Sequence, residues 1–181
     1  MNKNLYPKKR GFTLIEILVV TALTAILSGI AIGYSNTGQQ NIALFRDQAK
    51  VINAILRAKS LAVQSYVKGG AGCAYGVHFD QNGSFRIFRD LDELSERHDC
   101  SSANNRYSPN LGEDLNPPEI SSLESSLSFA PGSILDISFI PPEPKVLIDQ
   151  TSKDGKVVIQ TKSGNSLKSI SINRFGQVNT K

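Results

Sequence analysis

The N-terminal part of the chain combines a basic leader, a glycine and a long apolar run. Four cations precede the glycine at position 11, namely Lys3, Lys8, Lys9 and Arg10. As an α-helix, residues 12–33 would rise about 33 Å at ~1.5 Å per residue, which is enough to cross a hydrocarbon core of ~30 Å. The positive-inside rule then predicts a cytoplasmic N-terminus, with residues 35–181 on the other side of the membrane.

Glu16 is the one ionisable side chain in this apolar run. An ionised carboxylate near the middle of a membrane helix costs roughly 2.5–3.5 kcal/mol on insertion scales. One interpretation is that Glu16 lies close to the membrane edge and extends to the lipid headgroups. The favoured interpretation is that it pairs with a positive group supplied by assembly or processing, because nothing within the run can neutralise it.

Residues 11–16, Gly-Phe-Thr-Leu-Ile-Glu, resemble the processing and assembly motif of type IV pilins and type II secretion pseudopilins. The resemblance implies that a prepilin peptidase cleaves after Gly11 and that the new N-terminal residue, Phe12, is N-methylated. It also implies that the Glu16 carboxylate pairs with the Phe12 ammonium of a neighbouring subunit, and so sets the register in which apolar helices pack. A secretory signal peptide is disfavoured, because the run carries a charge and exceeds the usual ~7–15 residues.

The net charge of +4 comes from the leader, because residues 1–11 contain four cations and no acid. The remaining charge is uneven. Residues 90–143 hold eleven acids and two arginines, whereas residues 145–181 hold seven bases and two acids. Two solvated surfaces are the simpler explanation, and steering of a charged partner is the alternative.

The sequence predicts an α+β fold in which a long N-terminal helix packs on an antiparallel β-sheet domain, as in pilins. Its segments are a leader (residues 1–11), a transmembrane and assembly helix (12–34), an amphipathic continuation of that helix (35–68) and an extracytoplasmic β domain (69–181). Apolar residues recur at three-four spacing along the continuation, and this stripe is expected to face the sheet. Its members are Ile42, Phe45, Ala49, Ile52, Leu56, Val63 and Tyr66.

Alternation of apolar and polar residues predicts the strands. Residues 75–79 and 85–88 flank an Asn-Gly turn and are expected to form a hairpin. Residues 90–126 are acidic and rich in Ser, Asn and Pro, and a long surface excursion is expected there. Further strands are predicted over residues 126–130, 134–140, 146–148, 157–161, 167–172 and 177–180. The run 169–178 resembles the ending of minor pseudopilins of the GspH/FimT type.

Two cysteines, Cys73 and Cys100, lie on the predicted outer side of the membrane. In an oxidising compartment they can form one disulfide, which would be worth ~3 kcal/mol, and two buried thiols are the alternative. Asp90, Asp92 and Glu96 form a weak candidate for a Ca²⁺ loop. A solvated acidic loop is the favoured interpretation there, because the run lacks the glycine and the alternation of an EF-hand. No metal and no cofactor is therefore predicted.

Catalytic chemistry is not indicated. His78 occupies a polar place in an alternating strand and is expected to face solvent. His98 lies close to Cys100 in an irregular acidic loop, which does not position a thiol–imidazole pair. Because no motif of a hydrolase, nucleotide-binding or metal-dependent enzyme is present, the chain is not expected to be an enzyme.

The function that this pattern predicts is a structural subunit of a type IV pilus or a type II secretion pseudopilus. The resemblance implies as partners a prepilin peptidase, other pilin or pseudopilin subunits and the membrane platform of the assembly machinery, with membrane lipid before assembly. The expected location is the cytoplasmic (inner) membrane, crossed once, with the β domain periplasmic, extracellular or in a surface fibre. The alternative is a minor pilin that binds DNA during uptake, with phosphate contacts from Lys162, Lys168 and Arg174.

Overall fold

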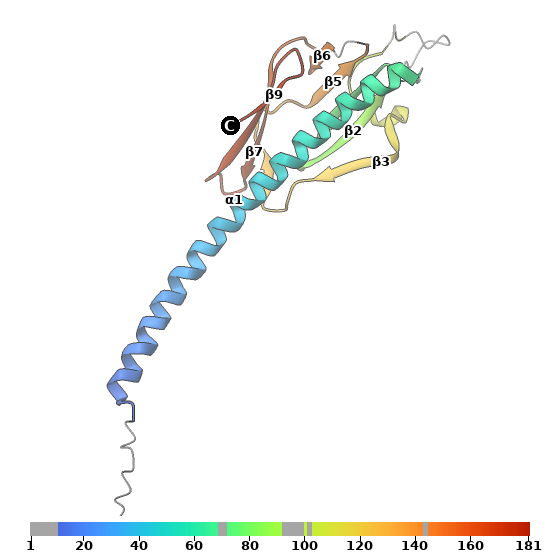
Figure 1. The fold of residues 1–181 in the computed structure, drawn as a ribbon. Helices are drawn as coiled ribbons and strands as arrows, with labels where there is room; N and C mark the ends of the chain where they lie inside the picture. Colours follow the sequence, from blue (N-terminus) through green and yellow to red (C-terminus); the bar gives the residue numbers. More distant parts are fainter. Residues whose placement is uncertain (1–10, 69–71, 92–99, 101–102, 143–144) are drawn as a thin grey trace, which may run out of the picture. The chain divides into compact units, whose positions relative to one another are not determined.

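The computed structural model describes residues 11–68, 72–91, 100, 103–142 and 145–181, and divides into two compact units, Met1–Gln39 and Gln40–Lys181. Helix α1 (Leu14–Lys68) contributes to both units (Figure 1). It begins two residues later than the predicted start at Phe12. The helix continues without a break through residues 33–40, a polar stretch that contains Gly38. Apart from Gly11, the predicted leader lies outside the described residues.

In the second unit, two antiparallel sheets and the C-terminal part of α1 share one apolar core. The predicted α+β class is confirmed, and the strands form two sheets where the sequence suggested one sheet under the helix. The first sheet has five strands, in the order β3 (Asp114–Ser122), β2 (Ser84–Asp90), β1 (Ala74–Phe79), β5 (Asp136–Ile140) and β6 (Lys145–Ile148). The second has four, in the order β4 (Leu127–Phe129), β7 (Gly155–Thr161), β8 (Leu167–Ile172) and β9 (Val178–Thr180).

The predicted strands are confirmed to within two residues at each end, including the first hairpin, in which Phe79 pairs with Phe85. The surface excursion predicted over residues 90–126 is wrong, because this stretch contains β3 and the short 3₁₀ helix η1 (Pro109–Leu111). β3 pairs with β2 only and carries Pro117 and Pro118. Proline donates no ladder hydrogen bond and is tolerated at a sheet edge. An edge strand that is mostly exposed has no apolar period to reveal it.

The segment of residues 103–113, called here the cover segment, packs on the five-stranded sheet. Side chains alternate along a strand, and Ile137 and Phe139 of β5 belong to the core that includes α1. Ser138, between them, therefore points to the other face, where its hydroxyl donates to the carbonyl of Asn105 at 2.7 Å. Tyr107 and Glu113 of the cover segment are buried. The five-stranded sheet is thus covered by α1 on one face and by the cover segment on the other.

The predicted orientation of α1 in the second unit is wrong. The stripe that was expected to face the sheet is largely exposed, with Ile42 at 69% and Tyr66 at 59% exposure. A second stripe with the same three-four spacing is buried instead. Its members are Leu44, Val51, Ile55, Ala58 and Ala62. Small side chains on the buried stripe allow a close approach of helix and sheet, and periodicity alone cannot choose between two stripes.

Asp47 explains why the buried stripe is hard to see in the sequence. It lies on that stripe, fully buried, and its carboxylate contacts Lys50 Nζ at 2.8 Å and Arg46 Nε at 3.3 Å. The backbone N–H of Glu124 also donates to it. Burial, the largest single influence, raises the pKa of Asp47, but Lys50, the Glu124 N–H and Arg46 together bring that pKa below its ordinary 3.8. The ionised carboxylate therefore ties α1 to the turn that follows β3.

Candidate assembly site at the N-terminus of helix α1

The first turn of α1 is closed by two reciprocal hydrogen bonds between Thr13 and Glu16. The backbone N–H of Glu16 donates to Thr13 Oγ1 at 3.3 Å, and the backbone N–H of Thr13 donates to Glu16 Oε2 at 3.5 Å. This is a capping box, in which the N-cap residue and the third helical residue satisfy each other's free amides. Both distances are long, so the carboxylate is held loosely. The Thr-x-x-Glu spacing is visible in the sequence, and the sequence reasoning missed it.

Glu16 is also the acidic residue of the first helical turn. The free amides there carry the positive end of the helix dipole, which favours a carboxylate. Cleavage before Phe12 would add an ammonium at this same end, where a second positive charge is unfavourable. Glu16 can offset that charge, either on its own chain or on a neighbour.

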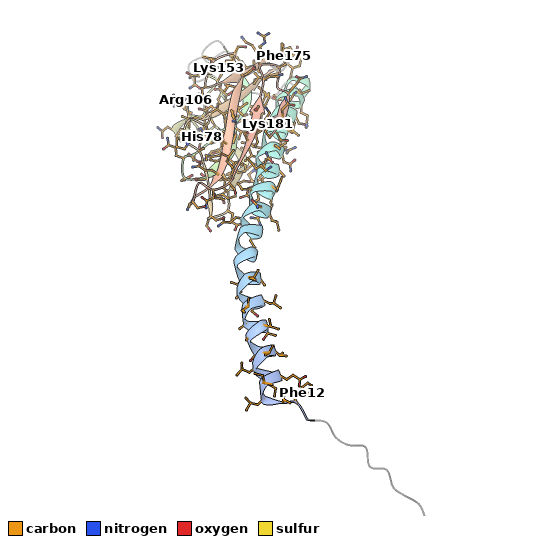
Figure 2. The ribbon with its side chains drawn as sticks, turned by 90° about the vertical axis from the view of Figure 1, so that its left-hand side faces the viewer. Phe12, His78, Arg106, Lys153, Phe175 and Lys181 are labelled. Carbon is orange, nitrogen blue, oxygen red and sulfur yellow. A yellow bond between two sulfur atoms is a disulfide. The ribbon has the colours of Figure 1, made fainter. Side chains whose placement is uncertain are left out.

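The helix that follows is apolar on all sides. Residues Leu14–Ile32 have a mean hydropathy of 2.3 and form the one helix in the described part that is long and apolar enough to cross a membrane. The side chains of residues 11–32 are exposed, Phe12 at 80% (Figure 2). The hydroxyls of Thr21, Thr24 and Ser28 donate to backbone carbonyls of the same helix. Their polarity is therefore satisfied locally, as a membrane requires.

The structure joins Cys73 and Cys100 in a disulfide. Cys73 directly precedes β1, and Cys100 lies three residues before the cover segment. The bridge therefore closes a loop of 28 residues and anchors one end of the cover segment to the sheet that it covers. Further along, the backbone N–H of Asn105 donates to Asp90 Oδ2 at 2.6 Å and that of Tyr107 to Asp136 Oδ1 at 3.4 Å.

These contacts give Asp90 a structural place beneath the cover segment, where it is fully buried. The other two members of the Ca²⁺ candidate, Asp92 and Glu96, lie outside the described residues, as does His98. Among the residues that are described, no group of three or more potential metal ligands occurs. The weak Ca²⁺ candidate is therefore not tested, and the absence of a metal at this loop stays a prediction.

His78 does not face solvent as expected. Its side chain is 19% exposed and lies between two carboxylates, with Nδ1 at 2.8 Å from Asp136 and Nε2 at 3.2 Å from Asp80. The Tyr107 ring lies 4.9 Å away, and Arg106 contacts the second oxygen of Asp136. Period-two alternation correctly placed His78 opposite the apolar core. It could not show that the cover segment encloses this face.

The pKa of His78 makes the stability of the second unit dependent on pH. Burial, the largest single influence, lowers this pKa, but the hydrogen bonds and charges of Asp136 and Asp80 raise it above its ordinary 6.5. A raised pKa in the folded state adds stability that is complete below pH 6.5 and disappears as the pH rises through the folded-state value. We therefore expect His78→Gln to destabilise the protein at pH 5.5 and to have a clearly smaller effect at pH 8.5.

Urea unfolding of both proteins at the two pH values measures this difference. Asp80 is also held ionised, with its pKa below the ordinary 3.8, and it stays charged across this window. A constant difference between the two proteins at both pH values would contradict a charged His78. Arg86, whose guanidinium contacts Asp80 and the Tyr107 hydroxyl, also stays charged across this window because its pKa is raised.

The three cations proposed for DNA contacts are spread over the β7–β8 hairpin. Lys162 follows β7 at one end, and Arg174 follows β8 at the other, about 20 Å away at ~3.3 Å per residue. Lys168 points toward α1, where its ammonium lies 4.2 Å from the centroid of the Phe45 ring. The structure does not gather them into one cluster, and the DNA contacts stay a prediction.

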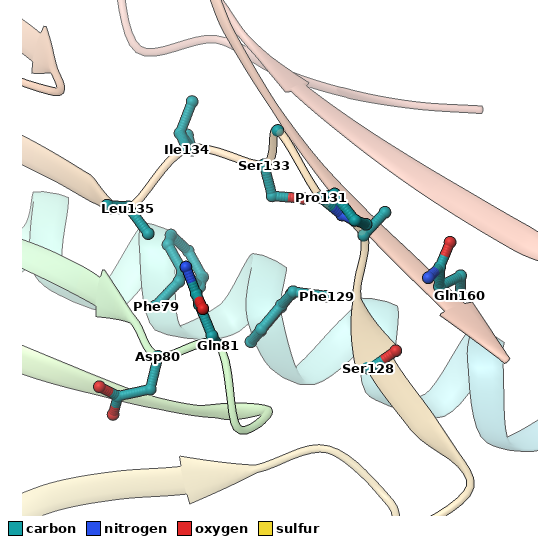
Figure 3. A pocket seen from close by; sticks show the side chains of 12 residues that line it. Phe79, Asp80, Gln81, Ser128, Phe129, Pro131, Ser133, Ile134, Leu135 and Gln160 are labelled. Carbon is teal, nitrogen blue, oxygen red and sulfur yellow. The ribbon is translucent and has the colours of Figure 1, made fainter. Parts of the chain in front are cut away.

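A hollow of about 420 Å³ lies where the β1–β2 turn meets the loop after β4 (Figure 3). The rings of Phe79 and Phe129 pack edge to face on its wall, with 5.4 Å between centroids. Asp80 is the one titratable side chain among its lining residues, and that carboxylate is held by Ser84 and Arg86. Ser133 Oγ accepts a hydrogen bond from the N–H of Val158. The lining brings together no base and nucleophile.

Residues 6–32 match the family model of the prokaryotic N-terminal methylation motif. No curated protein and no solved structure matches the chain. The match covers the cleavage region, the capping box and the apolar helix. This motif implies processing by a prepilin peptidase and assembly with like subunits, and it fits a single-pass anchor in the inner membrane.

Proposed function

We propose that this chain, a type IV pilin- or pseudopilin-like protein, is a minor structural subunit of a type IV pilus or of a type II secretion pseudopilus. One observation carries the proposal: an exposed apolar helix that lies within the match to the methylation motif and whose single charge lies in its first turn. Such a helix is stable either in lipid or among similar helices. In the core of a fibre, the helix is surrounded by similar helices and needs no lipid.

Before processing, the basic leader holds the N-terminus in the cytoplasm and residues 35–181 lie beyond the membrane. Residues 11–13 precede the helix in a non-helical conformation, and an added Cβ at Gly11 would meet no atom within 4 Å. A peptidase can therefore reach the peptide bond after Gly11 without first unwinding α1. Cleavage leaves Phe12 as the N-terminal residue, which is then methylated.

Assembly then depends on where the Glu16 carboxylate finds its positive partner. Among the described residues, its side chain accepts the long hydrogen bond from the Thr13 amide and forms no ion pair. The Phe12 ammonium of a neighbouring subunit offers a full charge in a medium of low dielectric, where a well-placed pair is strong and an unpaired charge is costly. Glu16 thus favours the one axial register in which it meets that ammonium.

The test is the intact mass and N-terminal sequence of the protein expressed with and without a prepilin peptidase. We expect a product that begins at Phe12 and carries one additional methyl group only when the peptidase is present. Gly11→Val is the matched control, because the open space around Gly11 lets the fold accept the side chain while the peptidase meets it directly. A product cut near residue 33, or equal cleavage of both variants, would contradict the proposal.

A further inference from the structure

The second unit leaves one apolar stripe of α1 uncovered. We call this stripe the seam. Its members are Ile42, Phe45, Ala49, Ile52, Leu56, Val63 and Tyr66, with Lys59 at the one polar place in the series. All of them except Ile52 and Lys59, which are half-buried, are exposed. Single exposed apolar residues need no explanation. A continuous stripe of them along one helix indicates a contact surface.

The spacing of the seam specifies what kind of partner fits it. Its places alternate steps of three and four residues, a mean of 3.5, which is the period of the a and d positions of a coiled coil. In a coiled coil, side chains with this period insert between the side chains of the facing α-helix. From Ile42 to Tyr66 the seam extends about 36 Å at ~1.5 Å per residue, which is more than three heptads.

Positive charge borders the seam on both sides. Residues 40–68 of α1 contain five bases and one acid, and that acid, Asp47, is buried. On one border, Arg46 and Arg57 are half-exposed. Arg46 forms an ion pair with Glu124, and Arg57 forms one with Glu119. The other border carries cations that, among the described residues, form no ion pair with a carboxylate. These are Lys168 and Arg174, and Lys59, which stands within the seam, likewise forms no such ion pair.

Lys59 joins the seam to the turn between β8 and β9. Lys59 Nζ donates to the carbonyl of Gly176 at 3.2 Å, which brings the β8–β9 turn against α1. Asn173 Oδ1 accepts the N–H groups of Phe175 and Gln177 and makes this turn rigid. The turn nevertheless leaves the Phe175 ring 65% exposed, at the upper end of the second unit in Figure 2. This exposed aromatic ring, in a turn that contacts Lys59 of the seam, adds apolar area beside the seam.

We propose that the seam binds an α-helix of a different subunit, one with an apolar stripe of the same period and with acidic residues beside it. Charge complementarity selects this occupant. Two copies of this chain packed seam to seam would bring basic borders together, which is unfavourable. The inference deepens the proposed function by naming the chemistry of a partner subunit. The subunit would then make two contacts with its neighbours: one through the apolar helix of residues 12–34, and a second, charge-selective one through the seam.

The experiment measures binding of two synthetic helical peptides to the full chain in phospholipid nanodiscs, with empty nanodiscs as the blank. Both peptides have leucine at the a and d positions over four heptads. One carries glutamate at the e and g positions and the other carries lysine there. By fluorescence anisotropy we expect the glutamate peptide to bind at least about tenfold more tightly at low salt, and this preference to shrink as salt screens the charges.

Leu56→Gln places a polar group on the seam and should weaken binding of the glutamate peptide about tenfold, whereas Leu167→Gln should leave it unchanged. Both leucines are exposed, at 49% and 60%, so neither change threatens the fold. Absence of binding, equal binding of the two peptides, or equal effects of the two variants would overturn the proposal. Self-association of the chain that Leu56→Gln abolishes would also overturn it, in favour of a second copy. Because the assay requires neither processing nor a fibre, its failure leaves the proposed function standing.

Discussion

Glu16→Ala is expected to reduce incorporation into fibres by at least about tenfold, while membrane insertion stays intact or improves. A carboxylate costs roughly 2.5–3.5 kcal/mol at the centre of a membrane helix on insertion scales, and its removal from the first turn relieves part of that cost. The same change leaves the Phe12 ammonium of the neighbouring subunit without its partner. Each ~1.4 kcal/mol of lost pairing lowers an association constant tenfold. Sheared-fibre fractions and membrane fractions, compared for the two proteins, measure both effects.

Glu16→Gln separates the charge from the capping box. Glutamine still offers a side-chain oxygen to the Thr13 N–H, as the carboxylate does in the structure, but it carries no charge. If pairing with the ammonium directs assembly, the glutamine variant fails like the alanine variant. If the cap alone matters, the glutamine variant assembles normally. Full incorporation of Glu16→Ala would remove the electrostatic step from the proposed mechanism.

The double variant Cys73→Ser, Cys100→Ser is expected to destabilise the second unit by about 3 kcal/mol, because the bridge closes a loop of 28 residues in the unfolded chain. For a unit of this size that corresponds to a loss in Tm of roughly 10 °C. The cover segment should loosen first, since the disulfide anchors its approach to the sheet. Thermal unfolding and hydrogen exchange at the amides of Asn105 and Tyr107 measure the two effects.

Reduction of the wild-type protein provides the matched control for the double variant. Wild type in the presence of a thiol reductant should reproduce the lowered Tm, and the same reductant should leave the double variant unchanged. Faster exchange confined to the cover segment, with α1 and β1 still protected, would place the effect where the contacts of Asn105 and Tyr107 predict it. A Tm within about 2 °C of wild type would show that other contacts hold the segment.

Local signals account for what the sequence predicted correctly. The apolar length, the basic leader and the lone Glu16 identify the anchoring helix, because each depends on neighbouring residues only. The Asn82-Gly83 turn and the alternation on either side of it predict the first hairpin for the same reason. The Thr13–Glu16 capping box belongs to this class as well, and it could have been recognised from its spacing.

Contacts between distant segments account for what the sequence could not decide. β3 carries no apolar period because it is an edge strand, and its place follows only from pairing with β2. His78 is enclosed by Tyr107, 29 residues further along the chain. Neither contact has a signature within a window of ten residues.

The sequence by itself determined that α1 is a long helix, apolar at its start and amphipathic later, followed by antiparallel strands. Only the tertiary structure decided which face of α1 is buried. Two stripes share the same period, and the buried one includes Asp47, whose charge is acceptable there only because Lys50, Arg46 and the amide of Glu124 surround it. Burial also depends on the Glu124 amide and on the two sheets, which the helix does not itself contain. The apolar seam, which has no such partners in the second unit, stayed exposed.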